Sequence, residues 1–202
     1  TNKKAVTKDR IKIDVMCNLE LSEEVKLLND SSDGVGLFRT EYLYMNRNDL
    51  PTEQEQYQAY NTVFKKVNSK PVTLRTLDIG SDKEVSENIR VGQIAKNPAL
   101  GLRGIRYSLH ERNLFKVQIK AMLRAAKNGK LRILIPMITT LDEINKAKEL
   151  IDEAKAELIK EKKSFNHKYE VGIMIEVPAS AIQSNVLSKH VDFMSIGTND
   201  LV

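Results

Sequence analysis

The chain has 202 residues, of which 41% are hydrophobic and 29% are charged, and its formal net charge is +5 at pH 7. This composition is typical of a soluble globular protein, and no apolar run approaches the roughly 20 residues that cross a bilayer. No tryptophan occurs, and no basic stripe is interleaved with aromatic residues, so nucleic-acid binding is not expected. The single cysteine, Cys17, excludes an internal disulfide framework and favours a reducing, cytoplasmic compartment.

Alternating apolar residues predict strands, and apolar residues at helical spacing predict helices. Residues 1–10 are polar and are expected to be a linker or tail, and residues 11–202 are expected to form one domain. The expected strands are 12–19, 35–39, 71–77, 130–137, 171–175 and 191–196. The expected helices are 21–29, 52–67, 113–127, 142–160 and 179–187.

Strands that alternate with helices predict an α/β fold with a parallel sheet. About six strand–helix units of this length favour a (β/α)8 barrel of the TIM type over an open sheet. No Gly-x-Gly-x-x-Gly follows the first expected strand, which disfavours a dinucleotide-binding fold. Since a closed barrel needs about eight strands, the barrel is expected to be incomplete and the chain to be part of a longer protein.

Two neighbouring expected strands each end at a carboxylate, Glu176 on one and Asp200 on the other. Ligands of such folds bind at the carboxyl ends of the strands. Two carboxylates side by side repel unless a cation lies between them, and Mg²⁺ prefers oxygen ligands. The alternative is that both residues only cap the helices that follow.

Further polar side chains are expected at the same ends of the strands. They are Arg39, Arg75, Asp78, Lys83, Arg103 and Asn199. Arginine grips phosphate or carboxylate with two hydrogen bonds, so the set indicates a ligand with several negative charges, such as a phosphorylated carboxylic acid. Taken singly, Arg39 could pair with Glu41, Arg75 could pair with Asp78, and Lys83 could be a solvated loop residue.

Five segments, in order, carry a resemblance to a known family. They are 33–41 (DGVGLFRTE), 75–83 (RTLDIGSDK), 97–106 (NPALGLRGIR), 174–178 (MIEVP) and 195–201 (SIGTNDL). Together they closely resemble the phosphoenolpyruvate-binding barrel of the phosphoenolpyruvate-utilising enzymes. Within that family the second segment is similar to the enzyme I group of the bacterial sugar phosphotransferase systems. The resemblance covers nearly the whole chain from about residue 12.

The resemblance implies a role for each matching residue. Glu176 and Asp200 would bind Mg²⁺. The residues that would contact phosphoenolpyruvate are Arg39, Arg75, Lys83, Arg103, Asn199 and Asp200. The family moves the phosphoryl group from phosphoenolpyruvate to a histidine on a separate domain, and from there to a histidine-containing phosphocarrier protein. Its members dimerise through this barrel, so a homodimer is expected of the complete protein.

The family's phosphohistidine and its acid cysteine have no counterpart in this sequence. None of the three histidines matches, and Cys17 lies in the first expected strand rather than in a late barrel loop. No catalytic residue is therefore expected within these 202 residues, and the chain alone is expected to be inactive. Two alternatives remain open: a non-catalytic dimerisation or regulatory barrel module, and a relative of pyruvate phosphate dikinase or phosphoenolpyruvate synthase.

Overall fold

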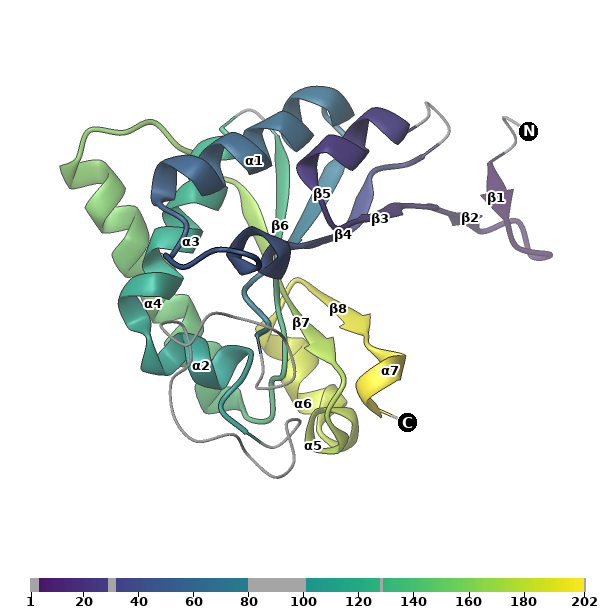
Figure 1. Cartoon of the computed structure of the whole chain (residues 1–202). Helices are drawn as coiled ribbons and strands as arrows, with labels where there is room; N and C mark the ends of the chain where they lie inside the picture. The colour runs from purple at the N-terminus through teal and green to yellow at the C-terminus, as the bar shows by residue number, and fades with distance from the viewer. Residues whose placement is uncertain (1–3, 29–31, 80–100, 128, 202) are drawn as a thin grey trace.

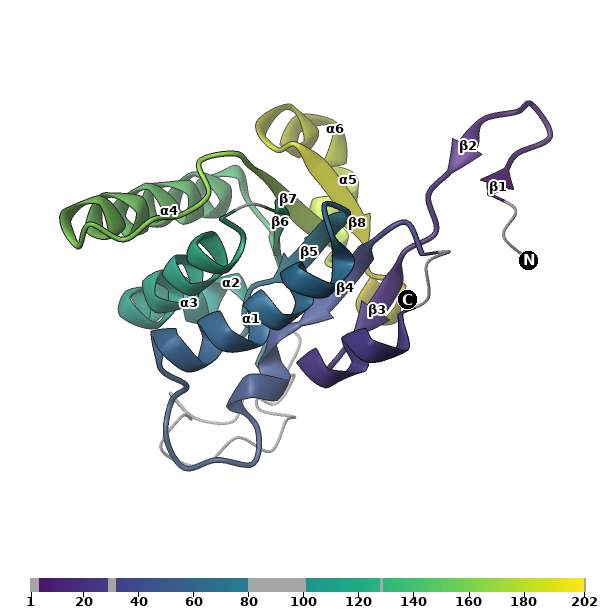
Figure 2. The same cartoon turned by 90° about the horizontal axis from the view of Figure 1, so that it is seen from above.

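A computed structural model describes residues 4–28, 32–79, 101–127 and 129–201. Six parallel strands form one sheet whose spatial order follows the chain. The strands are β3 (Cys17–Leu19), β4 (Val35–Arg39), β5 (Pro71–Arg75), β6 (Lys130–Ile135), β7 (Tyr169–Ile175) and β8 (Phe193–Ile196). The sheet curls into half a barrel (Figure 1 and Figure 2). The expected fold class, an incomplete (β/α) barrel, is confirmed.

Helices cover the outer face of this sheet. The α-helices are α1 (Glu53–Val67), α2 (Ile105–His110), α3 (Arg112–Ala125), α4 (Leu141–Lys160), α5 (Pro178–Ile182), α6 (Ser184–Leu187) and α7 (Thr198–Leu201). The 3-10 helices among the described residues are η1 (Ser22–Leu27), η2 (Thr40–Tyr44) and η5 (Ser188–His190). In Figure 2, α1, α3 and α4 lie side by side along the sheet.

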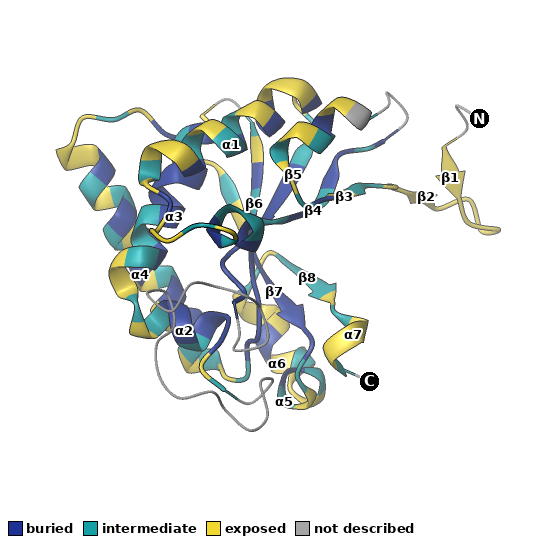
Figure 3. Ribbon diagram, viewed as in Figure 1, coloured by how far each residue is buried: buried dark blue, intermediate teal, exposed yellow. Residues whose placement is uncertain are grey.

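The long helices begin where the sequence indicates because a side chain caps each start. Thr52 accepts a hydrogen bond from the Glu55 N–H at the start of α1, and Thr140 does the same for Glu143 at the start of α4. In both capping boxes the glutamate reaches back to the capping residue. The apolar faces of these helices are buried against the central strands β5, β6 and β7, which are mostly dark blue in Figure 3.

The expected strand 12–19 is wrong in extent. Lys12–Ile13 is β2 and pairs antiparallel with β1 (Ala5–Val6), while the parallel sheet begins only at Cys17. Between the two strands, the Val15 N–H donates to Asp33 Oδ2 at 3.0 Å. The Asp33 N–H in turn donates to the Val15 carbonyl at 2.9 Å, so Val15 is held by Asp33 between the two pairings. The resulting hairpin projects away from the rest of the chain (Figure 1).

Two helical segments also differ from expectation. Helix α2 was not expected, and it begins directly after Gly104, whose φ is +54°. The expected helix 179–187 is divided at Gln183, where φ −95° and ψ 10° interrupt the helical path between α5 and α6. In the described part of the chain, no helix combines the length and the apolar character needed to cross a membrane.

Candidate functional site

Charged side chains gather at the carboxyl ends of β5, β7 and β8. Arg75 is the last residue of β5, Glu176 follows β7 directly, and Asp200 lies in α7 after β8. Asp78 and Arg103 come from the segments that follow β5 and precede α2. All except Asp200 are buried.

Arg75 is the centre of this cluster. Its Nη2 lies 2.5 Å from Glu41 Oε1, and its Nη1 lies 3.2 Å from Asp78 Oδ2. Nη1 also lies 3.7 Å from the sulfur of Met174, on the inward face of β7. Arg75 Nε is buried without a hydrogen-bond partner among the described residues. A buried unsatisfied donor of this kind is uncommon and marks a place where a ligand atom can bind.

Arg103 lies next to Arg75 because both bind the same carboxylate. Its Nε donates to Asp78 Oδ1 at 3.2 Å and its Nη2 to Asp78 Oδ2 at 3.1 Å, a two-pronged pair. Its Nη1 lies 3.7 Å from Asp200 Oδ1. Gly104 allows this placement, since its φ of +54° is readily adopted only by glycine and a Cβ there would lie 2.8 Å from Met137 Cβ.

Glu176 is 2% exposed, and a backbone N–H binds one of its two carboxylate oxygens. Its Oε1 accepts a hydrogen bond from the Met137 N–H at 2.6 Å. Its Oε2 faces Gly197, where an added Cβ would approach it to 2.9 Å. Burial, followed by repulsion from Asp78 and Asp200, raises the pKa of Glu176 to about 7, against the opposing effects of the Met137 N–H and Arg75.

Among the described residues, the cluster has more negative than positive groups. Two guanidinium groups, of Arg75 and Arg103, face the carboxylates of Glu41, Asp78, Glu176 and Asp200. Repulsion from the neighbouring carboxylates adds to burial, the larger cause, in disfavouring the ionisation of Glu176. A divalent cation between Glu176 and Asp200 would remove the surplus, and the missing side chain at Gly197 leaves room beside Glu176 Oε2. The residues present therefore fit a hard cation.

Within the described residues, no group of three or more His, Cys, Asp or Glu side chains is placed to hold a metal ion. Two protein carboxylates are nevertheless the usual contribution to a Mg²⁺ site whose other ligands are water and substrate oxygens. The site's geometry therefore suits an ion that binds together with its substrate.

Arg39 and Asn199, which were also predicted, make no ion pair with the residues of this cluster in the described part of the chain. Arg39, neighbour of Arg75 in the sheet, pairs with Glu20 at 2.8 Å, not with Glu41. Asn199 is exposed in α7 beside Asp200. Lys83 lies outside the described residues.

Two parts of the cluster were missed from sequence. Glu41 is 1% exposed and pairs with Arg75, whereas the sequence suggested it only as a surface partner of Arg39. The backbone N–H of Met137, which binds Glu176, was also missed. The signal for Glu41 was its place two residues after a strand end; nothing in the sequence indicates a particular backbone N–H.

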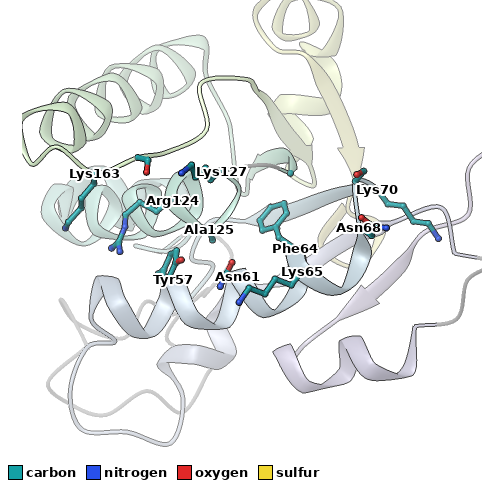
Figure 4. A pocket seen from close by; sticks show the side chains of 13 residues that line it. Tyr57, Asn61, Phe64, Lys65, Asn68, Lys70, Arg124, Ala125, Lys127 and Lys163 are labelled. Atoms are coloured by element: carbon teal, nitrogen blue, oxygen red, sulfur yellow. The ribbon is translucent and has the colours of Figure 1, made fainter.

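An open cavity of about 650 Å³ lies at the opposite, amino end of β5 and β6 (Figure 4). Its lining includes five basic side chains: Lys65, Lys70, Arg124, Lys127 and Lys163. Three of these already have partners, because Arg124 and Lys163 bind Glu53 and Lys70 donates to the Ser32 carbonyl. The cavity is remote from the carboxylate pair and is not part of the candidate site.

The fold and this cluster define a member of the barrel-based phosphoenolpyruvate-utilising enzymes. Residues 1–202 match the family described as PEP-utilising enzyme, PEP-binding domain, where PEP is phosphoenolpyruvate, and the chain belongs to that family.

Its relatives include several proteins named phosphoenolpyruvate-protein phosphotransferase. The chain is 45% identical to that of Priestia megaterium over 202 residues, 43% identical to that of Bacillus subtilis (strain 168) over 204, and 44% identical to that of Mycoplasma pneumoniae over 203. Each match covers 100% of this chain and 34–35% of the relative. The chain thus spans about a third of the length of the curated relatives it matches.

Proposed function

We propose that this chain binds phosphoenolpyruvate together with Mg²⁺ at the carboxyl ends of its strands. The observation that carries the proposal is the buried unpaired Nε of Arg75, next to Arg103 and opposite the Glu176 and Asp200 carboxylates. The two arginines could bind the phosphoryl group of a ligand, and a metal ion held by the two carboxylates could bind its carboxylate. Phosphoenolpyruvate has both groups.

Arg75 and Arg103 would hold the phosphoryl oxygens. Arg39, which neighbours Arg75 in the sheet, and Lys83, which lies outside the described residues, are the further cations that the sequence offers. Glu176 and Asp200 would hold Mg²⁺, and Asn199, exposed next to Asp200, would contact the substrate. When bound, Mg²⁺ supplies a charge that stabilises the negative oxygens during phosphoryl transfer. The chain's own residues would position the ligand.

For the whole protein we propose the activity that its relatives' name states. The phosphoryl group would pass from phosphoenolpyruvate to a histidine on another domain and then to a histidine-containing phosphocarrier protein. The complete protein would act as a homodimer in the cytoplasm. This reaction needs groups beyond the described cluster, which contains no histidine.

Titration calorimetry of this chain with phosphoenolpyruvate, with and without Mg²⁺, tests the binding proposal. We expect saturable binding that depends on Mg²⁺, because the cluster without metal carries surplus negative charge. Pyruvate and inorganic phosphate are the controls, since each offers only one half of the ligand and should bind at least about tenfold more weakly. Equal binding with and without Mg²⁺, or no binding of any of the three compounds, would overturn the proposal.

Gly104→Ala is expected to weaken phosphoenolpyruvate binding because it displaces Arg103. The added Cβ would meet Met137 at 2.7–2.8 Å in a backbone conformation of φ +54°. Strain of this kind costs about 1–3 kcal/mol. Chemical denaturation should therefore show lower stability, and titration should show lower affinity.

Gly34→Ala is the matched control. Gly34 also has a positive φ, +150°, and its added Cβ would lie 2.4 Å from the Pro71 carbonyl, at the amino end of the strands. We expect this variant to lose stability while its affinity is retained. If both variants lost the same affinity, Arg103 would have no special part in binding.

A further inference from the structure

A glutamine on an outer helix makes contact with the strand ends that carry the site. Gln118 lies in α3, the middle of the three outer helices, and is fully buried. Its Oε1 accepts a hydrogen bond from the Leu77 N–H at 2.9 Å, and its Nε2 donates to Thr40 Oγ1 at 3.0 Å. Because a backbone N–H can only donate, the bond to Leu77 fixes which end of the amide is the oxygen.

Thr40 extends the contact to Arg75. Its hydroxyl is fully buried and donates to the Arg75 carbonyl oxygen at 2.8 Å. One amide of α3 thus reaches the backbone at two places: through Thr40 at Arg75, the last residue of β5, and directly at Leu77, two residues beyond it.

These two backbone positions set the positions of the ligand-binding groups. Arg75 carries the unpaired Nε, and Leu77 directly precedes Asp78, whose carboxylate holds both Arg75 and Arg103. The last residue pair of β5 with β6 is Arg75 with Leu134, and the Thr76 N–H still donates to the Leu134 carbonyl at 2.9 Å, so the chain leaves the ladder between Thr76 and Leu77. The side-chain amide therefore takes over from the sheet where the sheet ends.

We propose that Gln118 is a positioning residue for the phosphoenolpyruvate site: through Leu77 and Thr40 it fixes the placement of Arg75, Asp78 and Arg103. It touches neither substrate nor metal. The inference rests on the proposed function for its effect on binding, but the effect on Arg103 does not depend on any ligand.

A second buried glutamine offers a matched control. Gln56, on α1, is 1% exposed and also uses both ends of its amide, accepting from the hydroxyls of Tyr44 and Tyr60 and donating to the Pro51 carbonyl. Gln56 makes no hydrogen bond with Arg75, Leu77 or Thr40, but its partner Tyr60 also accepts a bond of 3.5 Å from Gln118 Nε2. The Gln56 variant therefore tests whether a disturbance of this shared tyrosine alone has the expected effect. Gln118→Met and Gln56→Met each replace a buried amide with an apolar side chain of similar length.

The first measurement is the rate of hydrogen exchange at the Arg103 Nε–H, followed by NMR in the ligand-free chain. That proton is held by Asp78 at an Nε–Oδ1 distance of 3.2 Å. We expect exchange at least about tenfold faster in Gln118→Met and unchanged in Gln56→Met, although both variants lower Tm by about 2–8 °C. Equal exchange rates in the two variants would reduce Gln118 to a general packing role and overturn the proposal.

The second measurement is the phosphoenolpyruvate titration on the same variants in the presence of Mg²⁺. We expect Kd to rise about 10- to 100-fold in Gln118→Met, since small misplacements of binding groups have effects of this size, and to stay near the wild-type value in Gln56→Met. If the wild-type chain fails to bind, the proposed function fails, and the exchange measurement still decides the role of Gln118.

Thr40→Val keeps the test decisive should Gln118→Met fail to fold. Valine matches threonine in shape but has no hydroxyl, so it removes both the bond to the Arg75 carbonyl and the acceptor for Gln118 Nε2. The bond from the Leu77 N–H to Gln118 Oε1 remains. We expect faster exchange at Arg103 Nε–H and a raised Kd here too. Wild-type values of both in a folded Thr40→Val chain would contradict the route through Thr40.

Discussion

Glu176→Gln is expected to stabilise the metal-free chain at neutral and higher pH and, at the same time, to abolish the Mg²⁺-dependent part of phosphoenolpyruvate binding. Both effects have one cause, since the site keeps a carboxylate where burial and two neighbouring acids oppose its charge. Glutamine keeps the size and the acceptor for the Met137 N–H but carries no charge. A carboxylate that destabilises the folded chain when no metal is bound, but that binds the metal when it is present, is typical of a functional site.

The pH dependence follows from the direction of the shift. The pKa of Glu176 is raised from 4.5 to about 7 by folding, so the folded chain binds the proton more tightly than the unfolded chain. Its contribution to stability is complete below pH 4.5 and is lost as pH rises to about 7. One pKa unit corresponds to about 1.4 kcal/mol, so the loss is about 3 kcal/mol.

Urea denaturation across this pH range measures the effect as the difference between wild type and Glu176→Gln. The difference should be small in acid and should reach about 3 kcal/mol in favour of the variant above neutral pH. Glu170→Gln is the control, because Glu170 lies at the other end of the same strand, exposed and paired with Arg132. A pH-independent difference would mean that Glu176 keeps its charge without metal.

Arg75→Met is expected to remove phosphoenolpyruvate binding and to lower the free energy of unfolding by about 3–5 kcal/mol. The loss of stability arises because Glu41, 1% exposed, and Asp78 would lose a buried cationic partner. The loss of binding arises because the Arg75 guanidinium, which is proposed to hold the phosphoryl oxygens, is missing. Arg132→Met, which breaks an exposed pair on β6, should cost less than about 1 kcal/mol.

The double variant Arg75→Met with Glu41→Gln separates the two effects. Removing the buried carboxylate together with its partner should restore much of the lost stability, because no uncompensated charge remains at Glu41. Binding should stay absent, since the guanidinium is still missing. Restored binding in the double variant would show that Arg75 serves only to neutralise Glu41.

Much of the fold could be predicted because its periodicity is strong. The apolar strands 71–77 and 130–137 and the amphipathic helices 52–67 and 142–160 have patterns that only one arrangement buries well, and capping threonines fix the helix starts. The N-terminal hairpin could not be predicted in this way. Its strands are two residues long and exposed, so no buried apolar face marks them. Residues 12–13 therefore look like the start of the expected strand 12–19.

The sequence indicated several residues of the described cluster and one of its pairings, Arg75 with Asp78, but not the others. An arginine inside an apolar strand and carboxylates at strand ends marked Arg75, Glu176 and Asp200. Which acid each arginine binds depends on distances across the sheet, and Arg39 and Arg75 took Glu20 and Glu41. Gln118 left one signal, a polar residue within the apolar stripe of its helix, between Phe115 and Met122.

A crystal structure of the chain grown with phosphoenolpyruvate and Mn²⁺ in place of Mg²⁺ is the most direct test. The anomalous signal of Mn²⁺ would locate the metal without assumptions about the ligand. We predict one peak between Glu176 and Asp200, with the phosphoryl oxygens within hydrogen-bond distance of Arg75 and Arg103. A ligand bound instead in the basic cavity at the amino ends of the strands (Figure 4), or a metal away from Glu176, would contradict the proposed site.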